Sequence, residues 1–392
     1  MFWKLKIFVK GKNKKMVSKG LITLFFESAF IRRWNDHVSP VSLNELDKQA
    51  HKVLIAYVLA KFEETQRQKE INWIDLIEGA MFEFLHRVTL TDIKPQVFHR
   101  IMRQKGQQLN AWVIKKLKPH MIDNHPKLFE RFQHYFDDSS YSIEKKILQA
   151  SHYLATQWEF NLLYPYNQFK NTIEKTKEEI DDEIEDHMDL LGVQKIILGK
   201  KTSRLIGFCG ELRFQKRWTM SPQLPETSVL GHMLIVAMLA YLCALDCQPK
   251  DRNKKNIYYG GFFHDLPEVL TRDIISPVKT SVEGLKSIIA DMENKMLEDQ
   301  IMPLIPKAWQ EEILKYIHFK DAIDLKNNNE KTIDSRLIEA CDHLSAYIEA
   351  AVSYKHGITS RHLDEARKTL YKKYHDKVIG GIHFGRMFDY FS

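Results

Sequence analysis

The sequence predicts an all-α protein. Apolar residues recur at helical spacing through most of the chain, and the alternating valine, isoleucine and threonine runs that indicate strands are absent. The segments with helical periodicity are 43–64, 72–86, 143–160, 228–246, 284–301, 308–317 and 335–352. At 392 residues the chain exceeds one typical hydrophobic core, so we expect two domains.

The chain begins with a basic segment, residues 1–20, which carries seven lysines and no acidic residue. We interpret it as a solvated arm; a phosphate-attracting tail and a weak membrane-surface contact are the alternatives. Lysines interrupt its apolar residues, so it does not resemble a signal peptide.

Charge and composition narrow the function classes. The net charge is +7, but outside the basic arm 51 basic residues balance 51 acidic ones, so we expect no stable nucleic-acid partner. The chain is 44% hydrophobic and 28% charged, which is ordinary for a soluble protein. We expect no membrane span, because no stretch reaches about 18 uninterrupted apolar residues.

The four cysteines all lie in the second half of the chain: Cys209, Cys243, Cys247 and Cys341. Cys243 and Cys247 stand four residues apart in an apolar run, where buried reduced thiols are the preferred interpretation over a metal site or disulfide. The sequence therefore predicts a reducing, cytoplasmic compartment.

An internal repeat divides the chain. At a spacing of 181 residues, the apolar run that starts at His51 resembles the run that starts at His232, and the segment from Gly79 resembles the segment from Gly260. Two unrelated helical halves with similar apolar periods are the alternative. A charged, sparsely apolar helix at 172–191 leads to a boundary at 199–204, which gives domains at 21–200 and 201–392.

The two halves differ at the residues that carry chemistry. His264 and Asp265 correspond to Glu83 and Phe84, and Glu268 corresponds to Arg87. Further on, Asp342 corresponds approximately to His152. The first half is therefore interpreted as a degenerate copy without the site, and His51 as a core histidine.

Four polar residues of the second half stand in apolar surroundings: His232, His264, Asp265 and Asp342. Burial of these groups is costly unless something binds them. Two imidazoles and two carboxylates from three helices suit a divalent metal (Mn, Fe, Co, Zn or Mg) with an open coordination position. The alternative is four separate polar residues, each paired locally.

Two further acidic residues follow the His-Asp pair. On a continuous helix, Glu268 would share one side with His264 and Asp265 and could handle a proton; a surface carboxylate or helix salt bridge is the alternative. Asp273 has a counterpart in the first half and could either cap a segment or bind substrate. The dipeptide alone is weak, because it recurs at His375-Asp376 in a charged context.

These residues resemble the HD-domain phosphohydrolases, and within them the bacterial 5′-deoxynucleotidases. The similar features are Arg217-Trp218, then His232, then His-Asp-Leu-Pro-Glu-Val-Leu-Thr-Arg-Asp-Ile-Ile-Ser-Pro-Val-Lys at 264–279, and finally Asp342. The match covers roughly residues 210–350 and is most specific over 264–279.

The resemblance implies two tandem HD-type helical bundles and a set of roles. It implies that the metal ligands are His232, His264, Asp265 and Asp342. It implies that Glu268 assists catalysis together with the metal-bound Asp265. It implies that Arg217, Trp218 and Asp273 contact the nucleotide, with Lys279 a weaker phosphate contact; core packing is the alternative for Trp218.

The chain departs from the family at two points. Gly231 stands where an acidic residue often precedes the first histidine, and a degenerate copy precedes the active one. Since the family usually pairs with itself, we expect residues 20–200 to act as an intramolecular pseudo-dimer partner; a homodimer is also possible.

The leading functional hypothesis is a metal-dependent phosphomonoesterase acting on (deoxy)nucleoside 5′-monophosphates. One alternative keeps the metal and takes a nucleoside triphosphate or another nucleotide, because the pocket rather than the ligands sets the substrate. A third is a non-catalytic nucleotide-sensing protein, against which the intact set of candidate ligands argues.

Overall fold

The protein is built from helices, as the sequence predicts. The computed structural model describes residues 16–93, 95–137, 142–247, 251–272, 282–319 and 329–392. Within these residues the only sheet is a small hairpin of β1 (Val378–Ile379) and β2 (Ile382–His383). The basic arm falls largely outside the described residues. Within its predicted bounds, Val17 is buried and the first helix begins at Lys19.

Up to Glu211 the chain contains nine α-helices that the structure describes. They are α1 (Lys19–Glu27), α2 (Glu45–Gln66), α3 (Trp73–Leu90), α4 (Pro95–Met121), α5 (Pro126–Asp137), α6 (Ile143–Leu163), α7 (Ile173–Glu185), α8 (Leu191–Ile197) and α9 (Lys201–Glu211). The expected helices at 43–64, 72–86 and 143–160 are present as α2, α3 and α6. The predicted solvated helix corresponds to α7.

The second half repeats this helical character. Its described helices are α10 (Val229–Cys247), α11 (Asp251–Phe263), α12 (Glu268–Thr271), α14 (Leu285–Met296), α15 (Lys307–Ile317), α16 (Asn329–Lys355), α17 (Arg361–Tyr374) and α18 (Phe384–Asp389). The expected helix at 284–301 is present as α14 with a π-helical last stretch, Leu297–Ile301.

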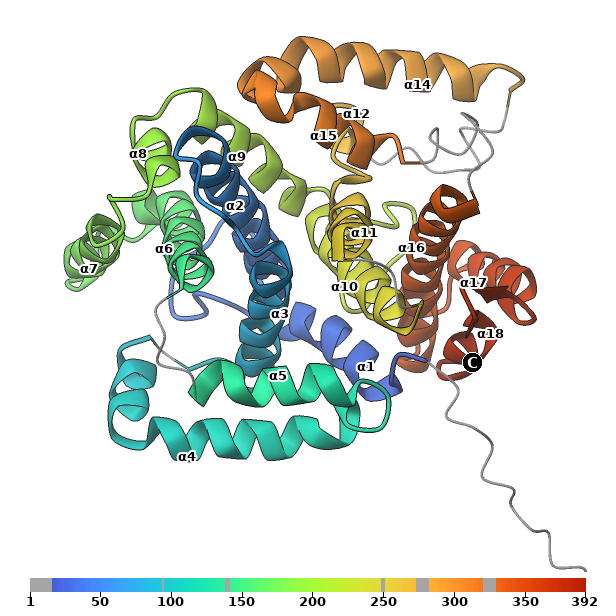
Figure 1. Ribbon diagram of the computed structural model, residues 1–392, viewed down its shortest axis with the longest axis horizontal. Helices are drawn as coiled ribbons and strands as arrows, with labels where there is room; N and C mark the ends of the chain where they lie inside the picture. The colour runs from blue at the N-terminus through green and yellow to red at the C-terminus, as the bar shows by residue number, and fades with distance from the viewer. Residues whose placement is uncertain (1–15, 94, 138–141, 248–250, 273–281, 320–328) are drawn as a thin grey trace, which may run out of the picture.

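Two helix groups stand side by side in the molecule (Figure 1). One gathers α2, α3 and α6, and the other gathers α10, α11 and α16. They meet where α2 packs against α10 and α3 against α11. Aromatic rings also form part of this contact. The ring centroid of Tyr57 lies 4.7 Å from that of Tyr259 and 5.1 Å from that of Phe263.

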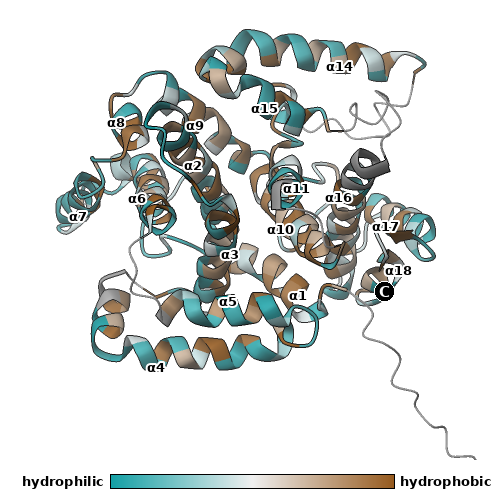
Figure 2. Cartoon of the chain, in the orientation of Figure 1, coloured by the Kyte–Doolittle hydropathy of each residue, from teal (hydrophilic) through white to brown (hydrophobic). Residues whose placement is uncertain are grey.

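Helix α10 is the apolar centre of the second half (Figure 2). It is the one described helix long and apolar enough to cross a membrane, but 94% of the qualifying window is buried inside the protein. Such burial is typical of a core helix, because α11, α16 and α2 cover it on several sides. Its sequence therefore reflects a packed interior.

The same backbone pattern leads into α2 and into α10. A β-bridge joins Arg32 to Asn44 in one half and Lys216 to Ser228 in the other. Asn44 and Ser228 then cap their helices, accepting hydrogen bonds from the backbone amides three residues later.

The equivalence of these caps corrects the expected pairing of His51 with His232. Both Lys48 and His232 donate their backbone N–H groups to the capping residues, Asn44 and Ser228. The residue of α2 equivalent to His232 is therefore Lys48, and His51 lies one helical turn beyond it. As predicted, His51 is a satisfied core histidine: it is fully buried, with Nε2 3.0 Å from the carbonyl oxygen of Ile206.

The predicted boundary at 199–204 lies at the start of α9, which does not separate from the first half. Helix α9 packs on α2, and α1 in turn contacts α10. Arg213, just beyond α9, reaches Glu159 of α6 with an N–O distance of 2.9 Å. Helices α2 and α10 are the core helices of the two halves. The helix before each of them, α1 or α9, thus contacts the core helix of the other half.

Gly231 is required where the two core helices approach each other. A Cβ at this position would lie 2.8 Å from Oδ1 of Asp47 and 2.8 Å from Cδ2 of Leu46. We predict that Gly231→Ala lowers the free energy of unfolding by about 1–3 kcal/mol, because the added methyl overpacks this contact. Urea denaturation measures the change.

The control is Gly207→Ala in α9, where a Cβ meets nothing within 4 Å. That variant is expected to be as stable as the wild type or more stable by about 0.5–1 kcal/mol, as for glycine replacement in an open helix. Equal stability of Gly231→Ala and the wild type would contradict the predicted close contact.

Candidate metal centre

The His-Asp pair lies in a turn between two helices. Helix α11 ends at Phe263 and α12 begins at Glu268, so His264 and Asp265 stand at a bend. The continuous helix on which Glu268 would share one side with His264 and Asp265 is therefore not formed at this point. A glycine allows the turn to lie close to α10, since a Cβ at Gly261 would lie 3.1 Å from the Cα of Ala237.

The turn fixes the orientation of the His264 ring. Its Nδ1 lies 2.8 Å from the carbonyl oxygen of Gly261, to which it donates its proton. Nε2 then carries the lone pair, as in most metal-binding histidines. This atom is buried, has no hydrogen-bond partner among the described residues, and lies 3.0 Å from Oδ2 of Asp265.

The other two predicted ligands approach from the neighbouring helices. His232 of α10 is fully buried, and its Nε2 lies 3.1 Å from Oδ1 of Asp342 on α16 and 3.7 Å from Oδ2 of Asp265. The Nδ1 atom of the same ring faces Ser345 at 3.1 Å. Both imidazoles thus direct Nε2 toward the two carboxylates.

This arrangement fits a divalent metal ion. One donor atom from each of His232, His264 and Asp342 lies within 4.8 Å of the others, and Asp265 adjoins both histidines. A lone pair of His264 that faces carboxylate oxygens is unfavourable unless a proton or a cation lies between them. The four residues predicted from separate parts of the sequence are therefore gathered into one mixed nitrogen and oxygen set.

A buried glutamate that the sequence analysis missed holds the Arg217-Trp218 pair beside these residues. Glu349 of α16 accepts hydrogen bonds from Nε of Arg217 at 3.2 Å and Nε1 of Trp218 at 2.7 Å. The backbone of Trp218 is left-handed, with φ at 57°, which this clamp stabilises. Arg217 also places Nη1 3.7 Å from Oδ2 of Asp265. The pair predicted to bind substrate therefore borders the candidate ligands.

Helical spacing was the signal that could have revealed Glu349. It follows Asp342 by two turns of α16, and Ser345 lies between them, so all three side chains share one face. The same spacing joins His152 and Glu159 in α6.

Electrostatics favours the ionised forms of Asp265 and Glu349. Burial alone would raise the pKa of Asp265, but the positive charge of a protonated His264 imidazole beside it brings that pKa below its ordinary value. Burial would likewise raise the pKa of Glu349, and Arg217 and His232 lower it to about 2. Burial and Arg217 act to lower the pKa of His232, yet Asp342 and Glu349 raise it overall. The site thus concentrates negative charge where a cation is expected.

Of the other predicted site residues, the structure describes Glu268, whereas Asp273 and Lys279 lie outside the described residues. Glu268 is half-buried at the first position of α12. The second dipeptide, His375-Asp376, lies on the surface as expected, where Nε2 and Oδ2 are 2.7 Å apart.

Comparison with known proteins places this region in a family. Residues 209–381 match the family model described as HD domain. This segment is an HD domain. The resemblance drawn from residues 210–350 is therefore confirmed, and the HD domain contains all four residues of the candidate metal centre.

Several relatives match part of the chain. A 5′-deoxynucleotidase of Vibrio parahaemolyticus is 25% identical over 184 residues, which cover 43% of this chain and 88% of that protein. The 4′-phosphooxetanocin A phosphatase of Priestia megaterium is 27% identical over 162 residues, or 40% of this chain and 75% of that protein. A solved cyanophage S-2L HD phosphohydrolase (DatZ), bound to dA and one catalytic Zn²⁺ ion, is 16% identical and covers 47% of this chain and 93% of its own, with a TM-score of 0.33.

The clamp on Arg217 predicts a specific acid sensitivity. Because the pKa of Glu349 is lowered to about 2 from an ordinary value of 4.5, its stabilisation is complete above about pH 4.5 and is lost as the pH falls toward 2. We expect Glu349→Gln to cost about 1.5–3 kcal/mol at neutral pH, as for loss of a hydrogen bond to a charged group, and to weaken the acid dependence.

Urea midpoints at pH 5 and pH 3 measure both effects. Glu339→Gln, on the same helix but partly exposed and paired with Lys373, is the matched control and should keep the wild-type acid dependence. An unchanged acid dependence in Glu349→Gln would contradict the clamp.

Proposed function

We propose that the HD domain is a metal-dependent phosphohydrolase that removes phosphate from deoxynucleoside 5′-monophosphates. The observation that carries the proposal is the convergence of His232, His264, Asp265 and Asp342, with both imidazoles directing Nε2 at two ionised carboxylates. The match of residues 209–381 to an HD domain and the relatives named 5′-deoxynucleotidase and phosphatase support it.

The four residues are the proposed ligands of a divalent ion. The mixed donor set suits Mn, Co, Mg, Fe or Zn. Such an ion supplies Lewis acidity toward a phosphoryl oxygen and activates water. The hydrogen bond from Nδ1 of His264 to the carbonyl of Gly261 leaves Nε2 directed at the Asp265 carboxylate, where a cation can take the place of a proton.

The Arg217-Trp218 pair is the proposed substrate clamp. The guanidinium of Arg217, beside Asp265, presents N–H donors suited to a phosphate oxygen, and the indole of Trp218 presents a flat surface to a sugar or base. Glu349 positions both side chains through hydrogen bonds without itself reaching the substrate in this scheme. Asp273 and Lys279 remain proposed substrate contacts.

Glu268 is the proposed proton-transfer group. It directly follows the turn that carries His264 and Asp265, and its backbone amide donates to the carbonyl of Asp265 at 3.1 Å. A carboxylate at this place can accept a proton from an attacking water.

The first half is proposed to be a degenerate HD-type copy that serves as a built-in partner. The chain would then consist of a basic arm (1–20), this copy (21–200) and the active domain (201–392). The shared β-bridges, helix caps and left-handed tryptophans support the copy, and the contact between α2 and α10 supports the pairing. We also propose a cytoplasmic location, which the four free cysteines support.

The central test is phosphate release from deoxynucleoside and nucleoside mono- and triphosphates with Mn, Co or Mg. We expect 5′-deoxynucleoside monophosphates to be the best substrates. Asp265→Ala should reduce the rate at least about a hundredfold, because loss of a metal ligand removes several kcal/mol of transition-state stabilisation.

The matched control is Asp376→Ala, which alters the same dipeptide at an exposed position. Its rate should equal that of the wild type. Activity that survives Asp265→Ala, or no release with any metal, would overturn the enzyme assignment. Triphosphates as the preferred substrates would overturn only the monophosphate assignment.

The built-in partner is tested by expressing residues 201–392 alone. Removal of α2 uncovers apolar surface on α10, so this fragment is expected to self-associate or precipitate. Size-exclusion chromatography with light scattering measures its state. A stable, folded monomer would contradict the pairing.

A further inference from the structure

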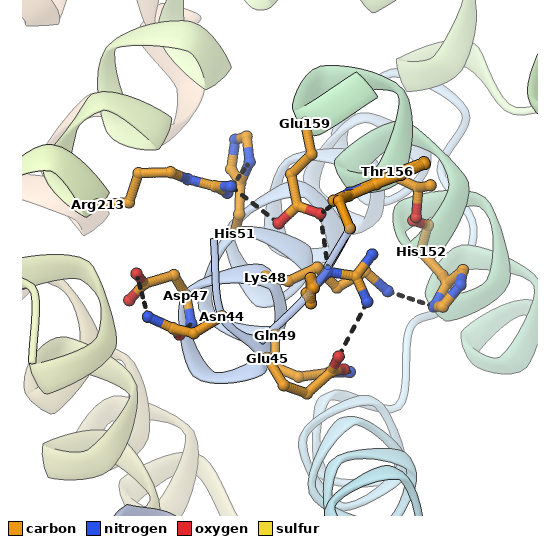
Figure 3. A network of polar contacts seen from close by, with 12 residues as sticks. Asn44, Glu45, Asp47, Lys48, Gln49, His51, His152, Thr156, Glu159 and Arg213 are labelled. Atoms are coloured by element: carbon orange, nitrogen blue, oxygen red, sulfur yellow. Dashed lines mark hydrogen bonds and ion pairs between the residues drawn. The ribbon is translucent and has the colours of Figure 1, made fainter. Parts of the chain in front are cut away.

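The first half contains a polar cluster at the place equivalent to the metal centre (Figure 3). Lys48 replaces His232, and its Nζ lies 2.5 Å from Nδ1 of His152 on α6. One helical turn after Lys48, Lys52 forms an ion pair with Glu83, the residue that corresponds to His264 in the repeat. Cationic side chains thus occupy the position where the second half directs metal-binding donors.

The frame around this cluster repeats the clamp of the second half. Glu159 of α6 accepts hydrogen bonds from Nε of Arg33 at 2.8 Å and from Nε1 of Trp34 at 3.0 Å. Trp34 also has a left-handed backbone, with φ at 55°. The first half therefore contains an arginine and a tryptophan that correspond to Arg217 and Trp218. They bond an equivalent buried glutamate, and the tryptophan has the same left-handed backbone.

The charge of the two clusters is opposite. The metal centre holds three carboxylates, Asp265, Asp342 and Glu349, and one arginine, Arg217, which pairs with Asp265 and Glu349. In the first half, five basic side chains converge on three carboxylates, which are Glu45, Glu83 and Glu159; the basic residues are Arg33, Lys48, Lys52, Arg87 and Arg213. One cluster requires a cation and the other requires an anion.

Lys48 is the group that most requires an anion. It is fully buried, and none of the described carboxylates forms an ion pair with it. The nearby Asp47 bonds Asn44 and Ser228 instead. Burial, followed by Arg33, lowers the pKa of Lys48, and burial together with Lys48 lowers the pKa of His152. A bound anion would relieve both penalties.

We propose that the Lys48 cluster is an anion-binding site that takes a phosphate group, either free or on a nucleoside monophosphate. Lysine and arginine N–H groups are the common partners of phosphate oxygens in proteins. Solvent reaches the cluster, because the Glu83 side chain is 31% exposed and Arg87 is 19% exposed, while Asp265 and Asp342 of the metal centre are 18% exposed. The first half is then a phosphate-binding site that needs no metal.

The test uses the full chain with the second site silenced by His264→Ala and Asp265→Ala, in the presence of a chelator. Inorganic phosphate and dAMP are titrated separately by calorimetry. We expect one site per chain, and Lys48→Met in the same background to weaken binding by about tenfold or more, as for loss of a charged hydrogen bond. Tighter binding of dAMP than of phosphate assigns a nucleotide; equal binding assigns free phosphate.

Thermal unfolding separates binding from a structural role. Phosphate should raise the melting temperature of the silenced protein. Lys48→Met should melt higher without phosphate, because the cost of burying this amine among other basic groups is removed, and should gain nothing from phosphate. Lys61→Met on the same helix is the matched control: Lys61 is paired with Glu64 and Glu312, so this variant should melt lower and keep its response to phosphate.

Arg87→Met provides a second variant at a partly exposed position and should also weaken binding. The proposal is overturned if the silenced protein binds neither ligand, or if Lys48→Met and Arg87→Met bind as it does. Phosphate release by the unsilenced protein is a separate measurement, so failure of the proposed enzyme and failure of this site are distinguishable.

Discussion

A buried glutamate in each half holds an arginine and a tryptophan against a central helix. Glu349 does so on α16 and Glu159 on α6, and both carboxylates are fully buried. A buried carboxylate is costly unless several donors surround it, and each glutamate has arginine and indole N–H groups as partners. Because these donors must reach the glutamate, the tryptophan keeps its left-handed backbone, and the β-bridge around it leads directly into α2 or α10. The residue one turn inside that helix, Lys48 or His232, is thereby placed next to the clamp.

In the proposed scheme, the residue at that position decides what each half binds. In α10 it is His232, which lies beside two carboxylates and His264. In α2 it is Lys48, which contacts His152 and lies near other basic side chains. Few changes of side chain thus invert the charge of a retained frame. An acidic cluster suits a metal ion, and a basic one suits a phosphate, so the two halves would serve complementary parts of the proposed phosphohydrolase.

Much of the HD domain was predictable from the sequence. The spacing of apolar residues located α10 and α16, and the four candidate ligands meet as expected because each stands in an apolar run where a lone polar group is costly. The relation of the halves was less predictable. A shift of three residues is close to one helical turn, so an apolar run matches almost equally well in either register, and His51 was paired with His232 in place of Lys48.

The sequence by itself determined the helical class, the identity of the candidate metal ligands and the absence of that set from the first half. Only the tertiary structure decided that the His-Asp pair lies in a turn, that Glu349 and Glu159 hold the clamps, and that Lys48 faces His152. The physical reason is that periodicity and residue type report which groups must be buried. The partner of a buried charge lies on another helix, more than a hundred residues away, and depends on how the helices pack.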